Sequence, residues 1–342
     1  MRCLFSRARA SCLPVPLPPA PSCFSVEGVL RMSSGARYVG RLAPSPTGAL
    51  HLGNARTFMI AWLRARARGG KVILRMEDLD HPRDKPGAAR EAVEDLKWLG
   101  FDWDEEYVQS ERKALYRAAL ERLHAQGLVY PCVCSRKDVE RAQSAPHAGD
   151  QLFYPGTCRG RFASWRAAQA FLREESDVPR LPCWRFRVEA GTVVRFEDVF
   201  AGPFGQDVAR TLGDFPVARD AFGAGYTLAV TVDDAAMGVT EVVRGDDLLA
   251  ATPAQILLYR ALGCEPPAFC HVPLVVGADG RRLAKRHGDT RIASYRAAGR
   301  RPEELVGLLA RTCGWGDGAS VRLRDLVPRA SLAAVPHRPV VL

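Results

Sequence analysis

Two short segments, far apart in the chain, carry residue types that bind nucleotides. Residues 41–54 read RLAPSPTGALHLGN and residues 281–287 read RRLAKRH. The first offers a histidine and a glycine after a loop, and the second offers a lysine. Phosphate oxygens accept hydrogen bonds from imidazole and backbone N–H groups, and an ammonium group can neutralise their charge. We therefore interpret the two segments as halves of one nucleotide-binding site and expect an adenylate-forming enzyme.

The elements that position the first segment follow from its composition. Residues 38–43 form a short apolar run that predicts a strand, and the prolines and glycine of residues 44–48 then require a loop. Residues 55–68 are rich in helix formers, with apolar side chains at helical spacing. The N-terminus of that helix would offer free N–H groups and a positive dipole to a triphosphate.

Three residues at the start of this helix are candidates for ATP binding. His51 and Asn54 would donate hydrogen bonds to phosphate oxygens as charge builds on the reacting phosphorus. Gly53 would let a flat adenine ring approach the backbone, because it has no side chain. Taken alone, HLGN is equally well explained by a capped surface helix with a chance histidine.

The wider pattern resembles the class I aminoacyl-tRNA synthetases of the glutamyl branch. HLGN stands where these enzymes have their HIGH motif, and residues 283–286, LAKR, stand where they have KMSKS. The resemblance implies that Lys285 balances charge on the pyrophosphate leaving group. The family's serine is Ala284 here, so we take the lysine as the functional part. Without the resemblance, such a basic run is usually a solvated or RNA-facing loop.

A glutamate substrate needs an acidic partner for its ammonium group and arginines for its carboxylates. By resemblance to the family's R-x-E-D-x-D segment, Glu77 would hold the ammonium, and Arg41 and Arg244 would bind the carboxylates. Each residue alone is also explained by an ordinary ion pair or a core tyrosine, and it is the joint match, in order, that favours a glutamate site. The residues expected there are Arg41, Leu42, Ala43, Pro44, Ser45, Glu77, Tyr226 and Arg244.

The resemblance covers residues 37–316 and is dense in 232–247, which nearly reproduce the family's D-D…G-V-T-x-V-V-R-G-x-D stretch. Predicted strands at 38–43, 71–76, 227–232 and 239–244 alternate with helices at 86–99, 110–126 and from 253 onward. This alternation predicts an α/β, doubly wound parallel sheet of the Rossmann-like kind. ATP and glutamate would then lie at the carboxyl ends of the strands, where the strand order reverses.

Length points to one branch of the family. Only 55 residues follow His287, too few for the helical anticodon-reading domain of a full glutamyl synthetase. The chain thus resembles the truncated glutamyl-queuosine tRNA(Asp) synthetases. That resemblance implies activation of L-glutamate by ATP and Mg²⁺ without tRNA, and transfer of the glutamyl group to queuosine in the anticodon of tRNA(Asp). The alternatives are a conventional glutamyl or glutaminyl synthetase and a non-catalytic tRNA-binding relic.

A cysteine cluster supports the same branch. Cys132, Cys134 and Cys158 supply three thiols, and Tyr154 supplies a phenol, within one insertion. Two cysteines one residue apart can bind one ion from a turn, and a third from a Pro-Gly loop approaches tetrahedral closure. The spacing resembles the zinc site of the glutamyl-queuosine enzymes, where one Zn²⁺ would be structural. Water or His147 is an alternative fourth ligand, and three unligated cysteines are the other interpretation.

Composition adds limits. The net charge of +10 suits a polyanionic partner, but residues 1–40 hold five arginines and one glutamate, so the remainder is only moderately basic. Prolines interrupt the first 36 residues, which show no membrane span and no convincing signal peptide. We expect this extension to be disordered or to precede a true start at Met32, although its composition could mimic a transit peptide. We expect a cytoplasmic monomer without a membrane partner.

The predicted organisation has five segments and no anticodon-binding domain. They are an N-terminal extension (1–36), the first half of the catalytic domain (37–131), a zinc-bearing acceptor-side insertion (132–213), the second half with the KMSKS-like loop (214–316) and a C-terminal remnant (317–342).

Overall fold

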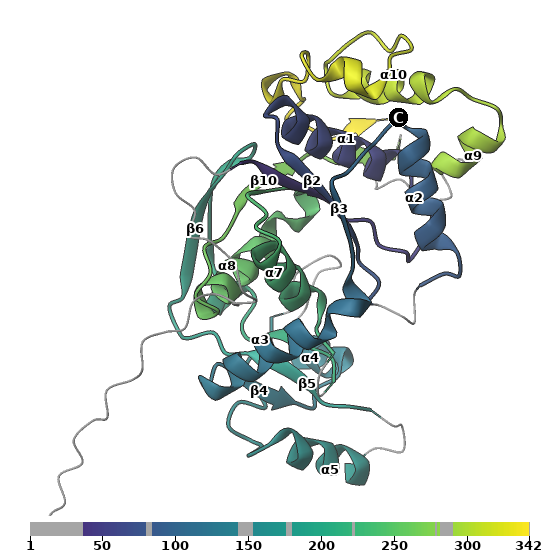
Figure 1. The fold of residues 1–342 in the computed structure, drawn as a ribbon. Helices are drawn as coiled ribbons and strands as arrows, with labels where there is room; N and C mark the ends of the chain where they lie inside the picture. The colour runs from purple at the N-terminus through teal and green to yellow at the C-terminus, as the bar shows by residue number, and fades with distance from the viewer. Residues whose placement is uncertain are drawn as a thin grey trace, which may run out of the picture.

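The computed structural model describes residues 37–79, 84–142, 153–175, 180–220, 223–277, 279–280 and 290–341 (Figure 1). Several predicted features lie outside these residues: the N-terminal extension with Met32, the alternative ligand His147, and the KMSKS-like loop with Ala284 and Lys285. Within the described residues, no helix is both long enough and apolar enough to cross a membrane.

Three parallel strands form the first sheet, in the order β1-β2-β3. The strands are β1 (Val39–Leu42), β2 (Lys71–Met76) and β3 (Glu105–Val108), and the helices between them are α1 (Leu52–Ala67) and α2 (Ala88–Trp98). Each connection contains a helix, as parallel strands require. β2 is buried along most of its length, which explains its nearly continuous apolar sequence. The strands predicted at 38–43 and 71–76 and both helices are confirmed.

The second sheet has the order β7-β6-β10-β9. Its strands are β6 (Val193–Asp198), β7 (Gly202–Asp207), β9 (Glu241–Gly245) and β10 (Ala268–Val272). β9, β10 and β6 run parallel, and β7 pairs antiparallel with β6. The backbone N–H of Thr240, just before β9, donates to the carbonyl of Val39 in β1 at 2.9 Å. This contact places the parallel strands of the two sheets side by side, as the predicted α/β architecture requires.

One predicted strand is wrong. Residues 227–232 belong to helix α7 (Tyr226–Ala236), which packs beside helix α8 (Thr252–Ala261). All seven residues from Leu228 to Asp234 are buried, so the run lacks the polar face from which a helical period could be read. Its β-branched residues favour a strand locally, and tertiary packing overrides that preference.

Residues 132–213, predicted as an insertion, begin at a small antiparallel sheet with the order β4-β5-β8. The strands are β4 (Val129–Cys132), β5 (Cys183–Phe186) and β8 (Phe215–Ala218), and the neighbouring helices are α3 (Lys113–Ala125), α4 (Arg136–Ala142), α5 (Trp165–Glu175) and α6 (Val208–Thr211). A separate core lies here, around Cys132, Tyr154 and Leu172. β6 and β7 fall within the predicted range, but β6 pairs with β10, so the chain rejoins the catalytic sheet there.

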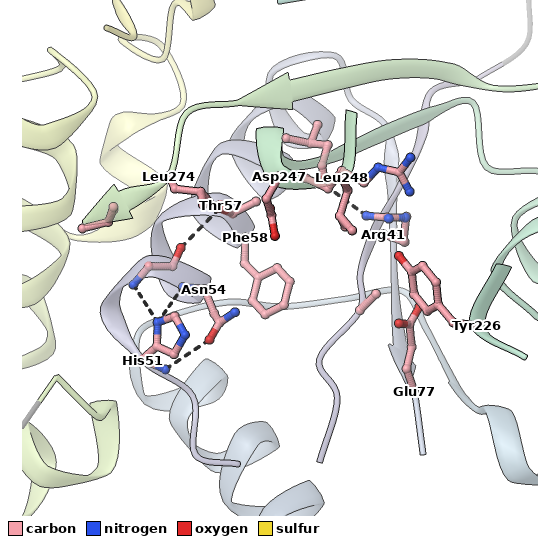
Figure 2. Close-up of a pocket in the computed structure, with 16 residues that line it drawn as sticks. Arg41, His51, Asn54, Thr57, Phe58, Glu77, Tyr226, Asp247, Leu248 and Leu274 are labelled. Carbon is pink, nitrogen blue, oxygen red and sulfur yellow. Dashed lines mark hydrogen bonds between the residues drawn. The ribbon is translucent and has the colours of Figure 1, made fainter. Parts of the chain in front are cut away.

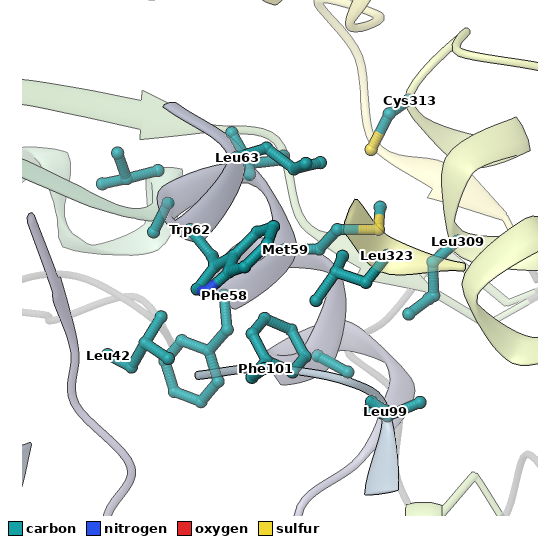
Figure 3. Packing of buried hydrophobic residues seen from close by; sticks show 14 of the residues in the cluster. Leu42, Phe58, Met59, Trp62, Leu63, Leu99, Phe101, Leu309, Cys313 and Leu323 are labelled. Carbon is teal, nitrogen blue, oxygen red and sulfur yellow. The ribbon is translucent and has the colours of Figure 1, made fainter. Parts of the chain in front are cut away.

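The C-terminal elements pack on α1, at the opposite end of the molecule from α5 (Figure 1). They are β11 (Val275–Val276), α9 (Ile292–Ala297), α10 (Pro302–Thr312) and β12 (Val340–Val341), with the short 3-10 helices η4 (Leu323–Leu326) and η5 (Leu332–Ala334). Two further 3-10 helices lie earlier in the chain, η1 (Gln109–Arg112) and η2 (Asp246–Ala251). Leu309, Cys313 and Leu323 meet Met59 and Leu63 of α1 in one apolar cluster (Figure 3). β12 pairs in parallel with β11, so the predicted remnant is an integral part of the core.

Candidate active site

A cavity of about 440 Å³ lies where β1, β2 and β9 end and α1 begins. It brings together eight of the predicted site residues, which are Arg41, Ala43, His51, Gly53, Asn54, Glu77, Tyr226 and Arg244. In Figure 2, Arg41, Tyr226 and Glu77 lie at one end, His51 and Asn54 lie at the other, and Phe58 stands between them. The cavity therefore has a charged end and a helix-terminus end.

The remaining residues that were expected to bind glutamate divide into two groups. Pro44 and Ser45 line an adjoining cavity of about 290 Å³, which shares Ala43, His51 and Asn54 with the first. Leu42 is fully buried in the apolar core and lines neither cavity. Successive side chains of a strand point to opposite faces, so Leu42 points away from Arg41. It packs with residues of α1 in the apolar core and thereby holds β1 against that helix.

His51 is the N-cap of α1. Its Nδ1 accepts hydrogen bonds from the backbone N–H groups of Gly53 at 3.2 Å and Asn54 at 3.4 Å. The side-chain oxygen of Asn54 faces the His51 backbone N–H at 3.5 Å, which completes a capping box. A Cβ at position 53 would lie 3.1 Å from the imidazole, so the glycine lets the histidine close over the helix terminus. The sequence predicts only that Gly53 lets an adenine ring approach the backbone. Its steric role beside His51 is visible in the structure alone.

Both described flanks of the KMSKS-like loop approach this helix terminus. On the C-terminal side, the N–H of Leu52 donates to the carbonyl of Thr290 at 3.0 Å, and the N–H of Ile292 donates to the carbonyl of Leu50 at 2.9 Å. On the N-terminal side, Val275 of β11 lines the cavity. The chain therefore leaves and re-enters the described structure beside His51, as the predicted two-part nucleotide site requires.

Arg244 is a buried cation in β9 with neutral partners. Its Nε donates to Nε2 of His271 at 2.9 Å, and its Nη2 donates to the hydroxyl of Thr252 at 2.7 Å. Among the described residues, no carboxylate lies within 4.0 Å of its guanidinium group, and burial lowers its pKa. A buried guanidinium with only neutral partners favours an anionic ligand in the cavity beside it.

Arg41 is held differently. Its Nη1 donates to the carbonyl of Val243 at 3.0 Å, and its Nε lies 3.7 Å from a carboxylate oxygen of Asp234. That Nε is buried and has no hydrogen-bond partner among the described residues. Arg41 therefore lines the same cavity as Arg244 while one carboxylate already balances part of its charge.

Glu77 is positioned by a residue that the sequence argument did not single out. The fully buried Arg75 donates to Glu77 at 2.9 Å and to Asp234 at 2.6 Å. Burial alone would lower the pKa of Arg75, but the carboxylates of Asp234, Glu77 and Asp233 raise it well above its usual value. Burial raises the pKa of Glu77, against the opposing effects of Arg75 and Arg41. An arginine inside an otherwise apolar strand was the signal available in the sequence.

The predicted metal ligands form a compact cluster. The Sγ atoms of Cys132, Cys134 and Cys158 all lie within 4.8 Å of one another, and the last two are 3.6 Å apart. The phenolic oxygen of Tyr154 lies 3.2 Å from Sγ of Cys132 and 3.6 Å from Sγ of Cys134. In a tetrahedral zinc site with bonds of about 2.3 Å, sulfur atoms are separated by about 3.8 Å. The four donors therefore fit one tetrahedral ion.

The surroundings of Cys132 favour its thiolate form. Hydrogen bonds from Cys134, Cys158 and Cys183 lower the pKa of the Cys132 thiol. The buried Arg185 donates from Nε to Cys132 at 3.2 Å, and its guanidinium carbon lies 3.8 Å from the centre of the Tyr154 ring. The thiolate is the form that binds metal, so the surroundings of Cys132 suit a zinc ligand. Hydrogen bonds with Cys132 and Cys158 raise the pKa of the Cys134 thiol.

The fold and the site together define a class I tRNA synthetase catalytic domain, and comparisons with known proteins agree. A sequence model of that class, tRNA synthetases class I (E and Q), catalytic domain, matches residues 38–327. A glutamyl-Q tRNA(Asp) synthetase from Symbiobacterium thermophilum is 50% identical, over 88% of this chain and 94% of its own length. Another from Rhodopirellula baltica is 50% identical, over 81% and 85% respectively.

A solved structure is also similar. The crystal structure of a glutamate tRNA ligase from Elizabethkingia meningosepticum, in complex with its amino acid, has a TM-score of 0.74 and 26% identity. The match covers 90% of this chain and 67% of that one. The chain therefore belongs to the family of the glutamyl-Q tRNA(Asp) synthetases, which are class I tRNA synthetase-like ligases.

Proposed function

We propose that the protein activates L-glutamate with ATP to glutamyl-adenylate without tRNA, and then transfers the glutamyl group to queuosine in the anticodon of tRNA(Asp). One observation carries the choice of amino acid: the buried Arg244 faces the cavity without a carboxylate partner among the described residues, while Glu77 lies in the same cavity. The names of the relatives in Symbiobacterium and Rhodopirellula support the choice of tRNA.

The charge of Arg244 favours glutamate over glutamine. Its guanidinium group has only neutral hydrogen-bond partners among the described residues, whereas Arg41 lies 3.7 Å from a carboxylate oxygen of Asp234. A carboxylate of glutamate would pair with the charge of Arg244, and the neutral side-chain amide of glutamine would not. The ammonium of glutamate would pair with Glu77, and its carboxylates with Arg41 and Arg244.

The first step needs positioning and charge stabilisation. An oxygen of the glutamate α-carboxylate attacks the α-phosphorus of ATP, which enters as its Mg²⁺ complex; the new P–O bond forms as the bond to pyrophosphate breaks. The α1 terminus with His51 and Asn54 would stabilise the transferring phosphoryl group. Lys285, outside the described residues, would balance charge on the pyrophosphate.

In the second step a hydroxyl of queuosine attacks the activated carbonyl, and AMP leaves with the electrons of the C–O bond. No side-chain nucleophile is needed. The three cysteines and Tyr154 would hold one structural zinc ion. Protein donors would occupy all four of its coordination positions, so the ion would do no chemistry. It would fix β4 and the 154–158 turn to each other.

Glutamate-dependent exchange of pyrophosphate into ATP tests the proposal. The reaction is run with glutamate or glutamine, with and without tRNA, on protein beginning at Met32. Exchange with glutamate alone supports the proposal, because conventional glutamyl enzymes, by family resemblance, need tRNA for this step. Exchange only with tRNA would indicate a conventional synthetase, and no exchange under any condition would indicate a non-catalytic relic.

A further inference from the structure

Behind Arg244 lies a buried chain of polar groups that the proposed reaction does not use. Nδ1 of His271, in β10, lies 2.6 Å from Oδ2 of Asp198 at the end of β6. Nε2 of the same ring accepts from Nε of Arg244 at 2.9 Å. Asp198, His271 and Arg244 are 2%, 1% and 6% exposed. An aspartate, a histidine and an arginine from three adjacent strands are thus linked in series behind the cavity.

The hydrogen bonds define one tautomer of the imidazole. Oδ1 of Asp198 accepts from the backbone N–H groups of Phe200 at 3.0 Å, Ala201 at 2.8 Å and His271 at 3.1 Å. These three donors fix the carboxylate, so Oδ2 faces Nδ1 as an acceptor and requires the proton on Nδ1. Nε2 then has a lone pair, which is what the Nε–H of Arg244 requires.

We propose that Asp198 and His271 form a positioning relay, which keeps an imidazole lone pair facing Arg244 and so fixes its guanidinium plane for the glutamate carboxylate. This inference rests on the proposed function. Thr252 completes the arrangement: its hydroxyl accepts from Nη2 of Arg244 at 2.7 Å and lies 3.2 Å from the carbonyl of Leu248, to which it donates. With Nε and Nη2 held, Nη1 has no hydrogen-bond partner among the described residues, and it remains for the ligand.

The relay works only with a neutral imidazole. The groups that face His271 are Asp198 from β6, Arg244 from β9 and Thr252 from α8, and Phe269 is stacked beside it on β10. Arg41 in β1 and Asp246 in η2 also interact with it electrostatically. Burial lowers the pKa of His271 although its hydrogen bond to Asp198 opposes this, so the ring is neutral near pH 7. A proton on Nε2 would meet the N–H of Arg244 and remove the acceptor.

Asp198→Asn tests the relay with almost no change in shape. The remaining side-chain oxygen would still accept the three backbone N–H groups, so the new NH2 group would face Nδ1. The imidazole would then carry its proton on Nε2, against Arg244. We expect the KM for glutamate in pyrophosphate exchange to rise roughly tenfold to a hundredfold, with the KM for ATP unchanged. His271→Gln places a carbonyl oxygen near the Nε2 position and should retain more glutamate affinity than His271→Leu.

Nitrogen NMR of ¹⁵N-histidine-labelled protein reads the tautomer independently of activity. The expected result is an Nδ1–H ring in the wild type and an Nε2–H ring in Asp198→Asn. An Nε2–H ring in the wild type would overturn the relay. A switched tautomer with an unchanged KM for glutamate would overturn its role in positioning. A third outcome is a wild type that has the expected tautomer but shows no glutamate-dependent exchange. That result would refute the proposed function, and with it the relay's role in binding glutamate.

Discussion

At the scale of single residues, the charged end of the cavity is built from arginines that differ in how far their charge is balanced. Arg75 is fully buried and donates to both Glu77 and Asp234, whereas Arg244 donates only to His271 and Thr252 among the residues that the structure describes. A buried cation with carboxylate partners serves to position them, and one without such partners favours an anionic ligand. The same residue type therefore has two roles within one site.

Glu77→Gln tests the ammonium contact. Glutamine keeps the size of the side chain and one acceptor for Arg75, but it loses the negative charge that the ammonium of glutamate would meet. We expect the KM for glutamate in pyrophosphate exchange to rise roughly tenfold or more, while the KM for ATP stays unchanged. Glu121→Gln, at an exposed position on α3, is the matched control. Equal effects on both substrates would contradict this assignment.

At the scale of elements, the start of α1 depends on one glycine. Gly53→Ala places a Cβ 3.1 Å from the His51 imidazole, so the ring must move off the helix N-terminus. We expect a clear loss of kcat in pyrophosphate exchange with little change in the melting temperature. Gly316→Ala is the control, because Gly316 is exposed and a Cβ there meets nothing within 4 Å. If both variants keep full activity, the capped imidazole is not needed for the reaction.

The C-terminal strand supports the wall of the cavity. The N–H of Val340 donates to the carbonyl of Leu274 at 3.1 Å, and Leu274 lines the cavity. Val340→Pro removes this donor, whereas Val340→Ala keeps it. We expect the proline variant, but not the alanine variant, to lower kcat for pyrophosphate exchange. Equal activity in the two variants would mean that the pairing of β12 with β11 does not support the site.

Helix α2 contributes a pH-dependent contact to α9, through Asp95. Burial raises the pKa of this carboxyl from 3.8 to about 6, although Arg296, 3.4 Å away, opposes the shift. The folded chain holds the proton more tightly than the unfolded chain, so the contribution to stability is full below 3.8 and is lost as the pH rises through about 6. The loss is at most about 3 kcal/mol.

Asp95→Asn removes this titration. The melting temperature of the variant, relative to that of the wild type, should increase as the pH rises from 3.8 to about 6 and stay constant above that range. Thermal unfolding of both proteins in matched buffers measures the difference. A difference that does not change with pH would show that another group carries the titration.

At the scale of the whole molecule, the thiol cluster lies at the opposite end from α10, within its own small core. Elemental analysis of the purified protein should find one zinc ion per chain, and Cys158→Ser should lose most of it. Removal of the ion should lower the melting temperature while glutamate-dependent pyrophosphate exchange persists. Complete loss of exchange with an unchanged melting temperature would assign the metal a catalytic role instead.

Short motifs proved more informative than local propensity. HLGN, the Arg75–Glu77 strand end and the segment around Arg244 were placed correctly beside one cavity, because parallel strands bring their carboxyl ends to one edge. The helix at Tyr226 was missed because its buried sequence lacks a polar face. The partners of Arg244 were missed because His271 and Asp198 follow from strand pairing between distant segments, which no local pattern encodes.

The transfer step is tested most directly by incubating the protein with ATP, labelled glutamate and tRNA(Asp) that either carries or lacks queuosine. A second pair of these tRNAs has the 3′-terminal adenosine removed. We predict that glutamate is attached whenever queuosine is present, with or without the terminal adenosine, and is not attached in its absence. Attachment that requires the terminal adenosine and ignores queuosine would contradict the account and identify a conventional glutamyl-tRNA synthetase.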